Sequence, residues 1–387
     1  MKKLLSLLLS FILLNISVFG AEPISSAEPA ATPVHTISAH SAIVMEKETG
    51  RILFEKDAYS QKPMASTTKI MTAIVALEKG DLSSKIEISP TASGVEGSSM
   101  YLAQGEIMTL EELLYGLMLA SGNEAAVAIA EHFGGVDTFV GMMNQKAKEI
   151  GAVNTNFTNP NGLPDDKHYS TAYDMALLTA YGMKNPEFAK IVSTKTKEIS
   201  GEGKQIVRTL ENHNKLLSWY EGCMGVKTGF TEKAGRCLVT AARRNEMTVI
   251  CVTLNAYDDW KDHAFMLDNA FLKYKMTKVV DNSKPLGNIK ILNSYKSSLP
   301  LYGTDLYYPL AEGEKCEVIP APYESLTAPV MPSASCGTAE VKFGDKIIGT
   351  VTLSVKDYAD KNILRRTARG FKNTLKLVYA KWINLFR

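Results

Sequence analysis

The sequence has few cysteines and no excess of charge of either sign. Five cysteines in 387 residues are too few for a disulfide scaffold. The 43 Lys and Arg residues nearly balance the 41 Asp and Glu residues, so the net charge of +2 gives no reason to expect a nucleic-acid partner. Hydrophobic residues make up 45% of the chain and charged residues 22%, which excludes a disordered or collagen-like chain and argues against a multi-span membrane protein. At roughly 100–200 residues per domain, the length predicts two or three domains.

Two common hydrolase motifs are also absent. The six histidines form no H-E-x-x-H zinc motif, and no G-x-S-x-G turn is present to carry the nucleophile of a Ser-His-Asp enzyme. We therefore expect a catalytic site without metal or other cofactor. Among the cysteines, Cys237 and Cys251 lie in apolar runs and are expected to be buried thiols. Cys316 and Cys336 could pair in an oxidising compartment, and the sequence leaves that pairing open.

Residues 1–20 are typical of a secretory signal peptide. Two lysines precede the apolar run Leu4–Leu14, and the predicted cleavage lies near Gly20. A membrane anchor is the alternative, but the apolar run is short for a membrane span. Residues 21–37 are rich in Ala, Pro, Ser and Glu, which indicates a disordered lead-in.

At the other end of the chain, the sequence pattern of residues 359–387 predicts an amphipathic helix. From residue 362 onward it carries seven basic residues and no acidic ones, so the rest of the chain is net acidic. At about 100° per residue, its apolar and aromatic side chains fall on one face and its basic side chains on the other. This pattern favours a helix that lies in the plane of an anionic membrane surface. A terminal helix packed on its own domain is the alternative, but such packing does not require every charge to be positive.

Between the two ends, strands come first, helices cluster in the middle and strands return. Residues 41–56 predict a hairpin, and residues 235–255 predict two strands joined by a tight turn near Asn245. Helices are expected over residues 66–77, 110–121, 123–133, 137–150, 171–180 and 260–274. The simplest packing is one largely antiparallel sheet, built from both ends of this segment and covered by helices. Residues 277–358, with short β runs, prolines and a Gly344-Asp345 turn, indicate a separate all-β domain.

Ser66-Thr67-Thr68-Lys69 is the first of three short motifs that carry the candidate chemistry. This S-x-x-K tetrad opens a predicted helix, and positions i and i+3 share one helix face. The Lys69 amine can therefore reach the Ser66 hydroxyl. It can act as the base for that hydroxyl if burial and nearby positive charge lower the pKa of the lysine. The tetrad is common by chance, so it predicts little by itself.

The other two motifs are triplets. Ser121-Gly122-Asn123 lies in a turn between two predicted helices and offers a hydroxyl for proton relay and a carboxamide for a substrate amide. Lys227-Thr228-Gly229 precedes the β-rich run and offers an ammonium group, a hydroxyl and a glycine that a substrate backbone can approach closely. Each triplet is common in isolation, so the specific signal is the order of the three motifs along the chain.

In this order the motifs correspond to the S-x-x-K, S-D-N and K-T-G set of penicillin-binding proteins and class A β-lactamases, except that the middle motif reads S-G-N, which suits the carboxypeptidases. The chain resembles the secreted D-alanyl-D-alanine carboxypeptidases, which are low-molecular-mass penicillin-binding proteins of serine peptidase family S11. The resemblance is strong over residues 38–276 and looser through the β domain and the tail. Further matching segments are Pro63–Lys69, Asn159–Pro164, His168–Ala172, Asn212–Leu217 and Gly225–Thr231.

The resemblance implies a fold, a reaction and a location. The expected α/β fold is a β-lactamase/transpeptidase-like domain over residues 38–276, with a mostly antiparallel sheet covered by helices. A small all-β domain over 277–358 and the amphipathic helix of 359–387 follow. The implied reaction removes the terminal D-alanine from peptidoglycan pentapeptides through an acyl-enzyme, and β-lactam antibiotics would be covalent inhibitors. The enzyme would be exported and held peripherally at the outer face of the cytoplasmic membrane.

The resemblance also implies a role for each motif residue. Ser66 would be the nucleophile, Lys69 its general base and Ser121 a proton shuttle, while Asn123 would bind the peptide backbone. The substrate would further contact Lys227, which contributes positive charge, Thr228, which holds the terminal carboxylate, and Gly229. The backbone N–H groups of Ser66 and Phe230 would form the oxyanion hole. Position 230 is His in some relatives, and a backbone role tolerates Phe.

Two other functions are alternatives to this carboxypeptidase reaction. A serine β-lactamase of class A uses a Glu to activate the deacylating water, generally within E-x-x-L-N. No such string lies between Asn123 and Lys227, and β-lactamases do not usually carry this β domain and basic tail. A cell-wall-binding scaffold with a dead site is the rival from another class, but every motif residue is present.

Overall fold

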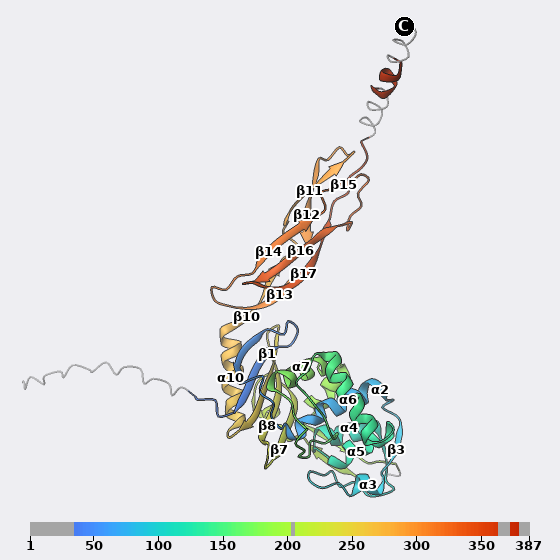
Figure 1. The fold of residues 1–387 in the computed structure, drawn as a ribbon, viewed down its shortest axis with the longest axis vertical. Coiled ribbons are helices and arrows are strands. Elements are labelled where there is room, and N and C mark those ends of the chain that lie inside the picture. The colour runs from blue at the N-terminus through green and yellow to red at the C-terminus, as the bar shows by residue number, and fades with distance from the viewer. Residues whose placement is uncertain (1–34, 203–205, 363–371, 379–387) are drawn as a thin grey trace, which may run out of the picture. The chain divides into compact units, whose positions relative to one another are not determined.

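The computed structural model describes residues 35–202, 206–362 and 372–378 (Figure 1). The predicted signal peptide, nearly all of the lead-in and most of the predicted terminal helix lie outside these residues. Residues 372–378 are helical with exposed side chains. Within the described ranges, every helix is too short or too polar to cross a membrane.

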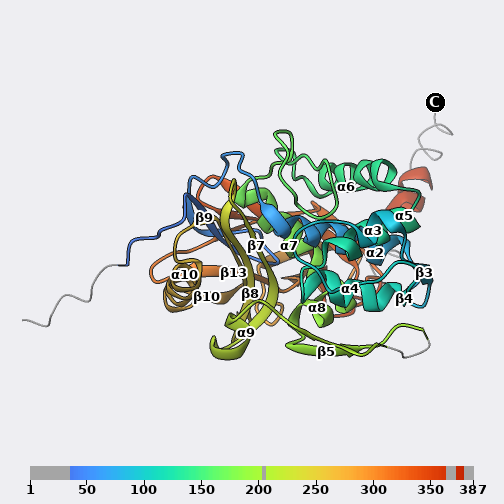
Figure 2. The ribbon, with the colours of Figure 1, turned by 90° about the horizontal axis from the view of Figure 1, so that it is seen from below.

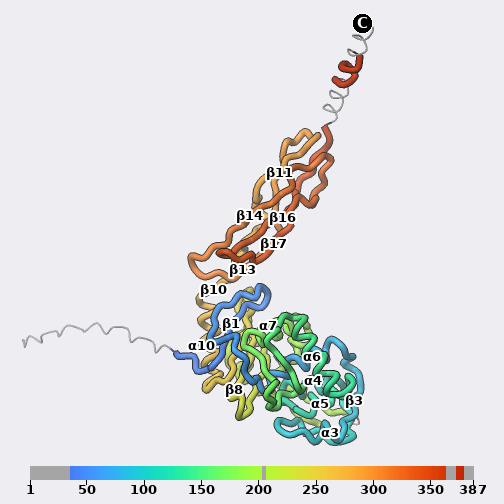
Figure 3. The backbone as a smooth tube through the Cα atoms, in the orientation of Figure 1, coloured from blue at the N-terminus to red at the C-terminus, as the bar shows by residue number. Residues whose placement is uncertain are grey.

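A five-stranded sheet with the order β2-β1-β9-β8-β7 organises the larger part of the chain. β1 (Ser41–Glu46) pairs with β2 (Ile52–Lys56) and with β9 (Met247–Ala256), while β8 (Gly235–Arg244) lies between β9 and β7 (Cys223–Thr231). Every pairing is antiparallel. The tube in Figure 3 can be followed from β1 through the helices and back to β8. This arrangement confirms the predicted sheet built from both ends of the segment.

Both faces of this sheet are buried, and β1 shows why. Alternate residues of a strand point to opposite faces. Ile43 and Met45 pack into the core shared with the larger group of helices, whereas Ala42 and Val44 pack against α10 (Asp259–Lys273). Figures 1 and 2 show α10 on one side of the sheet and α2, α4 and α7 on the other. The apolar run of β1 is therefore continuous rather than alternating, as expected for a strand covered on both sides.

The helical layer contains the helices that the sequence predicts and several short elements that it does not. The predicted helices appear as α2 (Lys69–Lys79), α4 (Leu110–Met118), α5 (Asn123–His132), α6 (Val136–Ile150) and α7 (Ala172–Gly182). The capping box is present, because Thr109 Oγ1 accepts a hydrogen bond from the Glu112 N–H and Glu112 Oε2 accepts one from the Thr109 N–H. The unpredicted elements are α3 (Pro90–Ser93), α8 (Pro186–Ser193), α9 (Leu216–Trp219), β3 (Lys85–Glu87), β4 (Ile107–Thr109), β5 (Thr196–Ile199) and β6 (Arg208–Glu211).

The C-terminal region is rich in strands and has its own hydrophobic core, as predicted. β10 (Tyr274–Val280) pairs with β13 (Leu306–Ala311), so the predicted boundary at residue 276 falls inside β10. A six-stranded sheet has the order β14-β16-β17-β12-β11-β15. Its strands are β11 (Gly287–Leu292), β12 (Ser298–Gly303), β14 (Glu317–Pro322), β15 (Ser325–Thr327), β16 (Ser335–Phe343) and β17 (Lys346–Val355). The predicted turn at Gly344 joins β16 to β17 with a φ of 58°.

All five cysteines are free thiols in the structure. Cys237 and Cys251 are fully buried in the central sheet, as predicted. Cys316 and Cys336, whose pairing the sequence leaves open, form no disulfide. The Cys336 thiol instead donates to the backbone carbonyl of Ala334 at 3.1 Å.

A fully buried histidine ties α10 to the sheet. His263 Nδ1 lies 2.9 Å from Thr240 Oγ1, and Nε2 lies 3.0 Å from Thr253 Oγ1. Burial lowers the pKa of His263 to about 3, because the imidazolium would lose its hydration there. The folded protein therefore keeps His263 neutral at a pH where the unfolded chain already binds a proton.

This difference predicts that acid destabilises the fold through His263. The stability contribution is complete above pH 6.5 and falls as the pH drops from about 6.5 toward 3, by at most about 1.4 kcal/mol per pH unit. Replacing His263→Gln should flatten the slope of unfolding free energy against pH between 7.5 and 5, measured by urea denaturation. The exposed His132→Gln is the matched control and should keep the wild-type slope. An unchanged slope in His263→Gln would contradict the assignment.

Candidate active site

Ser66 lies in a strained turn at the start of the central helix. Residues Ala65–Thr68 form a 3₁₀ turn, and the α-helix proper begins only at Lys69. Ala65, directly before Ser66, has a φ of 48°, which is uncommon for a residue with a side chain. The turn still places the two ends of the S-x-x-K motif together, because Lys69 Nζ donates to Ser66 Oγ at 3.0 Å.

Lys69 is completely buried, and its amine is held by three oxygen atoms. Besides Ser66 Oγ, the amine donates to Asn123 Oδ1 at 2.6 Å and to the backbone carbonyl of Asn161 at 2.7 Å. Burial lowers the pKa of Lys69 well below its usual value, the charge of Lys227 lowers it further, and Glu124 acts in the opposite direction. Burial and a neighbouring positive charge are the two conditions under which a lysine can serve as a base.

The S-G-N motif forms the wall of the site opposite the strand. Ser121 is buried in the turn between α4 and α5, with a φ of 61°, and Asn123 is the first residue of α5. Both ends of the Asn123 carboxamide bind the protein, because Oδ1 accepts from Lys69 and Nδ2 donates to the carbonyl of Glu96 at 2.6 Å. These two bonds fix the orientation of the carboxamide, and the second N–H of Nδ2 and the second lone pair of Oδ1 remain for another partner.

Glu124, which the sequence does not single out, supports the same wall. Its side chain is buried, and Oε1 accepts hydrogen bonds from Ser99 Oγ and from the Met100 N–H, both at 2.6 Å. The backbone carbonyl of Ser98 in turn accepts from the Asn123 N–H at 2.8 Å. The carboxylate therefore fixes the loop that carries Ser98 beside Ser121.

The K-T-G motif lies on β7, which is the edge strand of the sheet. Lys227 is buried, its amine donates to the carbonyl of Thr228 at 2.8 Å, and burial lowers its pKa to about 7. A Cβ atom at Gly229 would lie 3.0 Å from the Ser66 nitrogen and 3.1 Å from the Thr67 nitrogen. The glycine therefore lets β7 approach the turn of Ser66 closely. Phe230 follows with its side chain 66% exposed.

The Asn159–Pro164 segment packs on the other side of the turn. Gly162 has a φ of 91°, and a Cβ atom there would lie 2.1 Å from the Ala65 carbonyl oxygen. Thr72 Oγ1 donates to the carbonyl of Pro160 at 2.6 Å. Sequence reasoning matched this segment to the family without a role, and the structure shows its main contribution, which is the Asn161 carbonyl that binds Lys69.

His168 supports the turn of Ser66 through a hydrogen bond to Thr68. Its Nδ1 accepts a hydrogen bond from the Thr158 N–H, so Nε2 carries the proton that is shared with Thr68 Oγ1 at 2.8 Å. Burial lowers the pKa of His168 to about 4, which keeps the ring neutral. Thr68 Oγ1 in turn donates to the Ala65 carbonyl at 2.8 Å and thereby braces the strained residue before Ser66.

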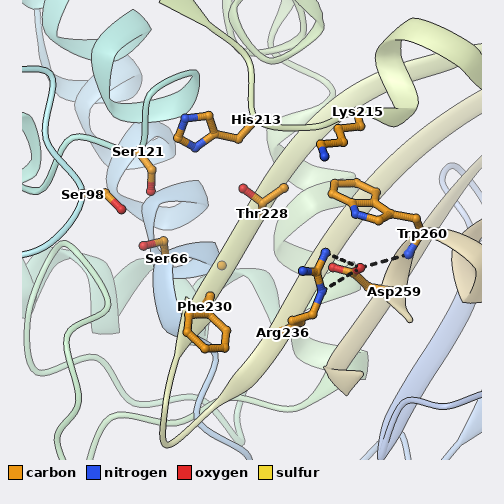
Figure 4. A pocket seen from close by; sticks show the side chains of 11 residues that line it. Ser66, Ser98, Ser121, His213, Lys215, Thr228, Phe230, Arg236, Asp259 and Trp260 are labelled. Atoms are coloured by element: carbon orange, nitrogen blue, oxygen red, sulfur yellow. Dashed lines mark hydrogen bonds and ion pairs between the residues drawn. The ribbon is translucent and has the colours of Figure 1, made fainter. Parts of the chain in front are cut away.

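These elements enclose a cleft of about 370 Å³ (Figure 4). Its lining consists of Ser66, Ser98, Ser121, His213, Lys215, Thr228, Gly229, Phe230, Arg236, Asp259 and Trp260. Across the ranges that the structure describes, His, Cys, Asp and Glu side chains form no group of three that could hold a metal ion. The chemistry that this geometry supports is acyl transfer to a serine hydroxyl with a buried amine as base.

Six residues of the cleft lining were not assigned a role from the sequence, and one of them is Ser98 on the loop that Glu124 fixes. His213 and Lys215 belong to a segment that matches the family, but no motif predicts that they face Ser66. Arg236, Asp259 and Trp260 come from β8 and from the start of α10. Only the pairing of β7 with β8, and the packing of α10 beside them, brings these three to the cleft.

The sequence is similar to those of known proteins of one family. Residues 26–258 match the family model of D-alanyl-D-alanine carboxypeptidase, Peptidase_S11. The D-alanyl-D-alanine carboxypeptidase DacF of Bacillus subtilis is 32% identical, and the alignment covers 99% of each chain. DacA of Haemophilus influenzae is 31% identical over 91% of this chain and 92% of its own length.

The structure is also similar to a solved penicillin binding protein. Penicillin binding protein 5 from Haemophilus influenzae superposes with a TM-score of 0.69 at 28% identity, covering 85% of this chain and 99% of that one. The family match spans more than half of the sequence and contains all three motifs. The chain belongs to the D-alanyl-D-alanine carboxypeptidase family, peptidase family S11.

Proposed function

We propose that this serine DD-carboxypeptidase removes the terminal D-alanine of peptidoglycan stem peptides through an acyl-enzyme on Ser66. The observation that carries the proposal is the 3.0 Å contact between Ser66 Oγ and the fully buried amine of Lys69. A neutral amine at that position can take the hydroxyl proton as the oxygen attacks.

The first step forms the ester and releases D-alanine. Ser66 Oγ attacks the carbonyl carbon of the penultimate D-alanine while Lys69 accepts the proton. The backbone N–H groups of Ser66 and Phe230 stabilise the oxyanion that develops. The C–N bond then breaks, and the leaving amine receives the proton by way of Lys69 and Ser121.

The second step hydrolyses the ester. Water attacks the acyl carbon and gives a proton to Lys69 by way of Ser121. The bond between the acyl carbon and Ser66 Oγ then breaks, and Lys69 returns the proton to Oγ. Asn123 and Thr228 hold the peptide on either side of the cleft. A β-lactam undergoes the same attack, but its leaving nitrogen stays tethered to the adduct, so the penicilloyl ester on Ser66 should be released slowly. Rapid, repeated turnover of penicillin would favour the β-lactamase alternative instead.

The proposal also assigns a role to each region of the chain. Residues 1–20 would direct export, residues 38–276 would form the catalytic domain, and residues 277–358 would separate it from the tail. The basic and apolar faces of residues 359–387 support peripheral binding to anionic lipid on the outer face of the cytoplasmic membrane.

Replacing Ser66→Ala tests the nucleophile. Release of D-alanine from a peptide ending in D-Ala-D-Ala should fall by more than about a thousandfold, and covalent labelling by fluorescent penicillin should disappear. Ser297→Ala, an exposed serine of the β region, is the control and should keep both activities. If wild-type protein released no D-alanine, the dead-scaffold alternative would replace this proposal.

The pH dependence of catalysis tests the relation between the two buried lysines. Because the charge of Lys227 lowers the pKa of Lys69, Lys227→Gln should raise the pKa of Lys69. Activity requires the neutral base, so the acid limb of the profile of kcat/KM against pH should move to higher pH, along with any loss of rate. Lys233→Gln, at a half-exposed lysine of the β7–β8 turn, should leave the limb in place. A shift to lower pH in Lys227→Gln would contradict the coupling.

Truncation before Asn362 tests the tail. The shortened protein should lose its binding to vesicles that contain phosphatidylglycerol, measured by co-sedimentation, because it lacks seven basic residues and the apolar face. Its activity on a soluble peptide should remain unchanged. The intact chain on purely zwitterionic vesicles is the control for charge. Equal vesicle binding by the intact and truncated proteins would rule out the tail as the anchor.

A further inference from the structure

The C-terminal domain carries an exposed apolar patch at the end where the chain continues into the tail. Between 39 and 61% of each residue in it is exposed. The patch, called the tip patch below, consists of Leu292, Tyr295, Met331 and Tyr358. Leu292 ends β11, Tyr295 belongs to the β11–β12 loop, Met331 to the loop after β15 and Tyr358 to the segment after β17. Figure 1 shows β11 and β15 at the end of this domain that is remote from β10.

An antiparallel bridge places Met331 beside Tyr358. Val330 pairs with Ala359, and each backbone N–H donates to the carbonyl of the other residue, at 2.9 and 3.0 Å. Residues that flank such a pair also face each other, so the side chains of Met331 and Tyr358 are neighbours. Val330 and Ala359 are buried, and the alternation of side chains along a strand therefore turns Met331 and Tyr358 outward together.

A second antiparallel bridge brings Tyr295 to the same segment. Ser294 pairs with Lys361, so Tyr295 lies opposite Asp360. Asp360 and Tyr358 are alternate residues and leave the same side of the segment. The three loops thus present one continuous surface rather than scattered apolar side chains.

The predicted membrane helix starts within a few ångströms of this surface. The Asn362 N–H donates to the carbonyl of Asn293 in the β11–β12 loop at 2.7 Å. Leu364, on the predicted apolar face of the tail, is two residues further on, and two residues of chain span at most roughly 7 Å. The headgroup region on each side of a bilayer is roughly 5–8 Å thick. A tail whose apolar face enters the lipid therefore holds the tip patch at the level of the headgroups.

The tip patch offers apolar contact rather than an excess of charge. The exposed charged residues of its loops nearly balance, and they are Lys296, Lys356, Asp357, Asp360 and Lys361. Tyrosine suits the boundary between lipid and water, because its ring is apolar while its hydroxyl stays hydrated. The seven basic residues of the tail supply the attraction to anionic lipid, and the patch adds buried apolar area.

We propose that the tip patch rests on the membrane surface beside the tail and forms a second lipid contact of the enzyme. The inference rests on the proposed function of the tail, because the tail brings the patch to the membrane. Once the tail is bound, contact by the patch is an intramolecular event at a high effective concentration. A patch too weak to bind alone then still adds to the affinity, which agrees with the loss of binding expected after truncation. A second contact also limits rotation of the domain about the tail.

The double variant Tyr295→Asn with Met331→Asn tests the contact in the intact chain. Its affinity for vesicles of phosphatidylglycerol and phosphatidylcholine, measured by co-sedimentation, should fall roughly 5- to 30-fold, because two apolar side chains no longer enter the interface. The fold loss should be equal at low and at high salt, since salt screens the charges of the tail and not the apolar contact. Activity on a soluble peptide should stay at the wild-type value.

The same domain offers a matched control at its other end. Tyr307 and Ile347 are exposed to a similar extent, and both lie near the β16–β17 turn, since Tyr307 precedes Tyr308, whose ring contacts Phe343. β17 has 10 residues and puts roughly 30 Å between this turn and the tip patch. Tyr307→Asn with Ile347→Asn should therefore bind vesicles as wild type does. Thermal melting of both double variants would reveal any loss of folding.

Hydrogen exchange locates the contact without any substitution. Vesicles should slow the exchange of backbone amides in residues 293–297 and 328–334 of the intact protein and leave residues 343–347 unchanged. Wild-type affinity in the tip variant, an equal loss in the control variant, or unchanged exchange in the two loops would overturn the inference while leaving the tail as the anchor. Failure of the intact protein to bind vesicles at all would overturn both the tail proposal and this one.

Discussion

The burial of one lysine amine is the constraint on which the site depends. Lys69 Nζ is out of contact with water and is bound by oxygens from a helix turn, from the start of another helix and from a loop. Removing an amine from water disfavours its protonated form, and burial accordingly lowers the pKa of Lys69 well below its usual value. The three oxygens come from Ser66, Asn123 and Asn161, which are distant in sequence. The helical layer has to fold correctly before the Lys69 amine has these three partners.

The turn that carries Ser66 is held in place from several sides rather than by its own preference. Ala65 adopts a left-handed conformation that an isolated chain would avoid. Gly229 on the strand side and Gly162 on the loop side both approach the turn so closely that a Cβ atom would collide with its backbone. Thr68 and His168 brace the turn from within. These contacts hold the Ser66 hydroxyl in one position at the edge of the cleft, as the proposed acyl transfer requires.

The sequence predicts the parts that depend on local pattern and on motif order. The hairpin of β1 and β2, the capping box at Thr109 and the return of strands after residue 235 follow from periodicity and turn residues. The contact between Ser66 and Lys69 follows from helical spacing. By contrast, the Asn161 carbonyl is a backbone group that any residue type could supply. Arg236 reaches the cleft only through cross-strand register, which the sequence leaves undetermined until β7 and β8 are paired.

The two kinds of cation in the cleft explain how catalysis and recognition coexist there. A lysine that is desolvated loses its proton, so Lys69 and Lys227, both buried, have lowered pKa values. An arginine keeps its proton under the same conditions, and Arg236 is moreover half-exposed and backed by a carboxylate. The interior end of the cleft can therefore supply an uncharged base while the outer end retains a fixed positive charge. In the proposed reaction the substrate carbonyl lies at Ser66, at the end of the cleft where the buried amine of Lys69 contacts the hydroxyl.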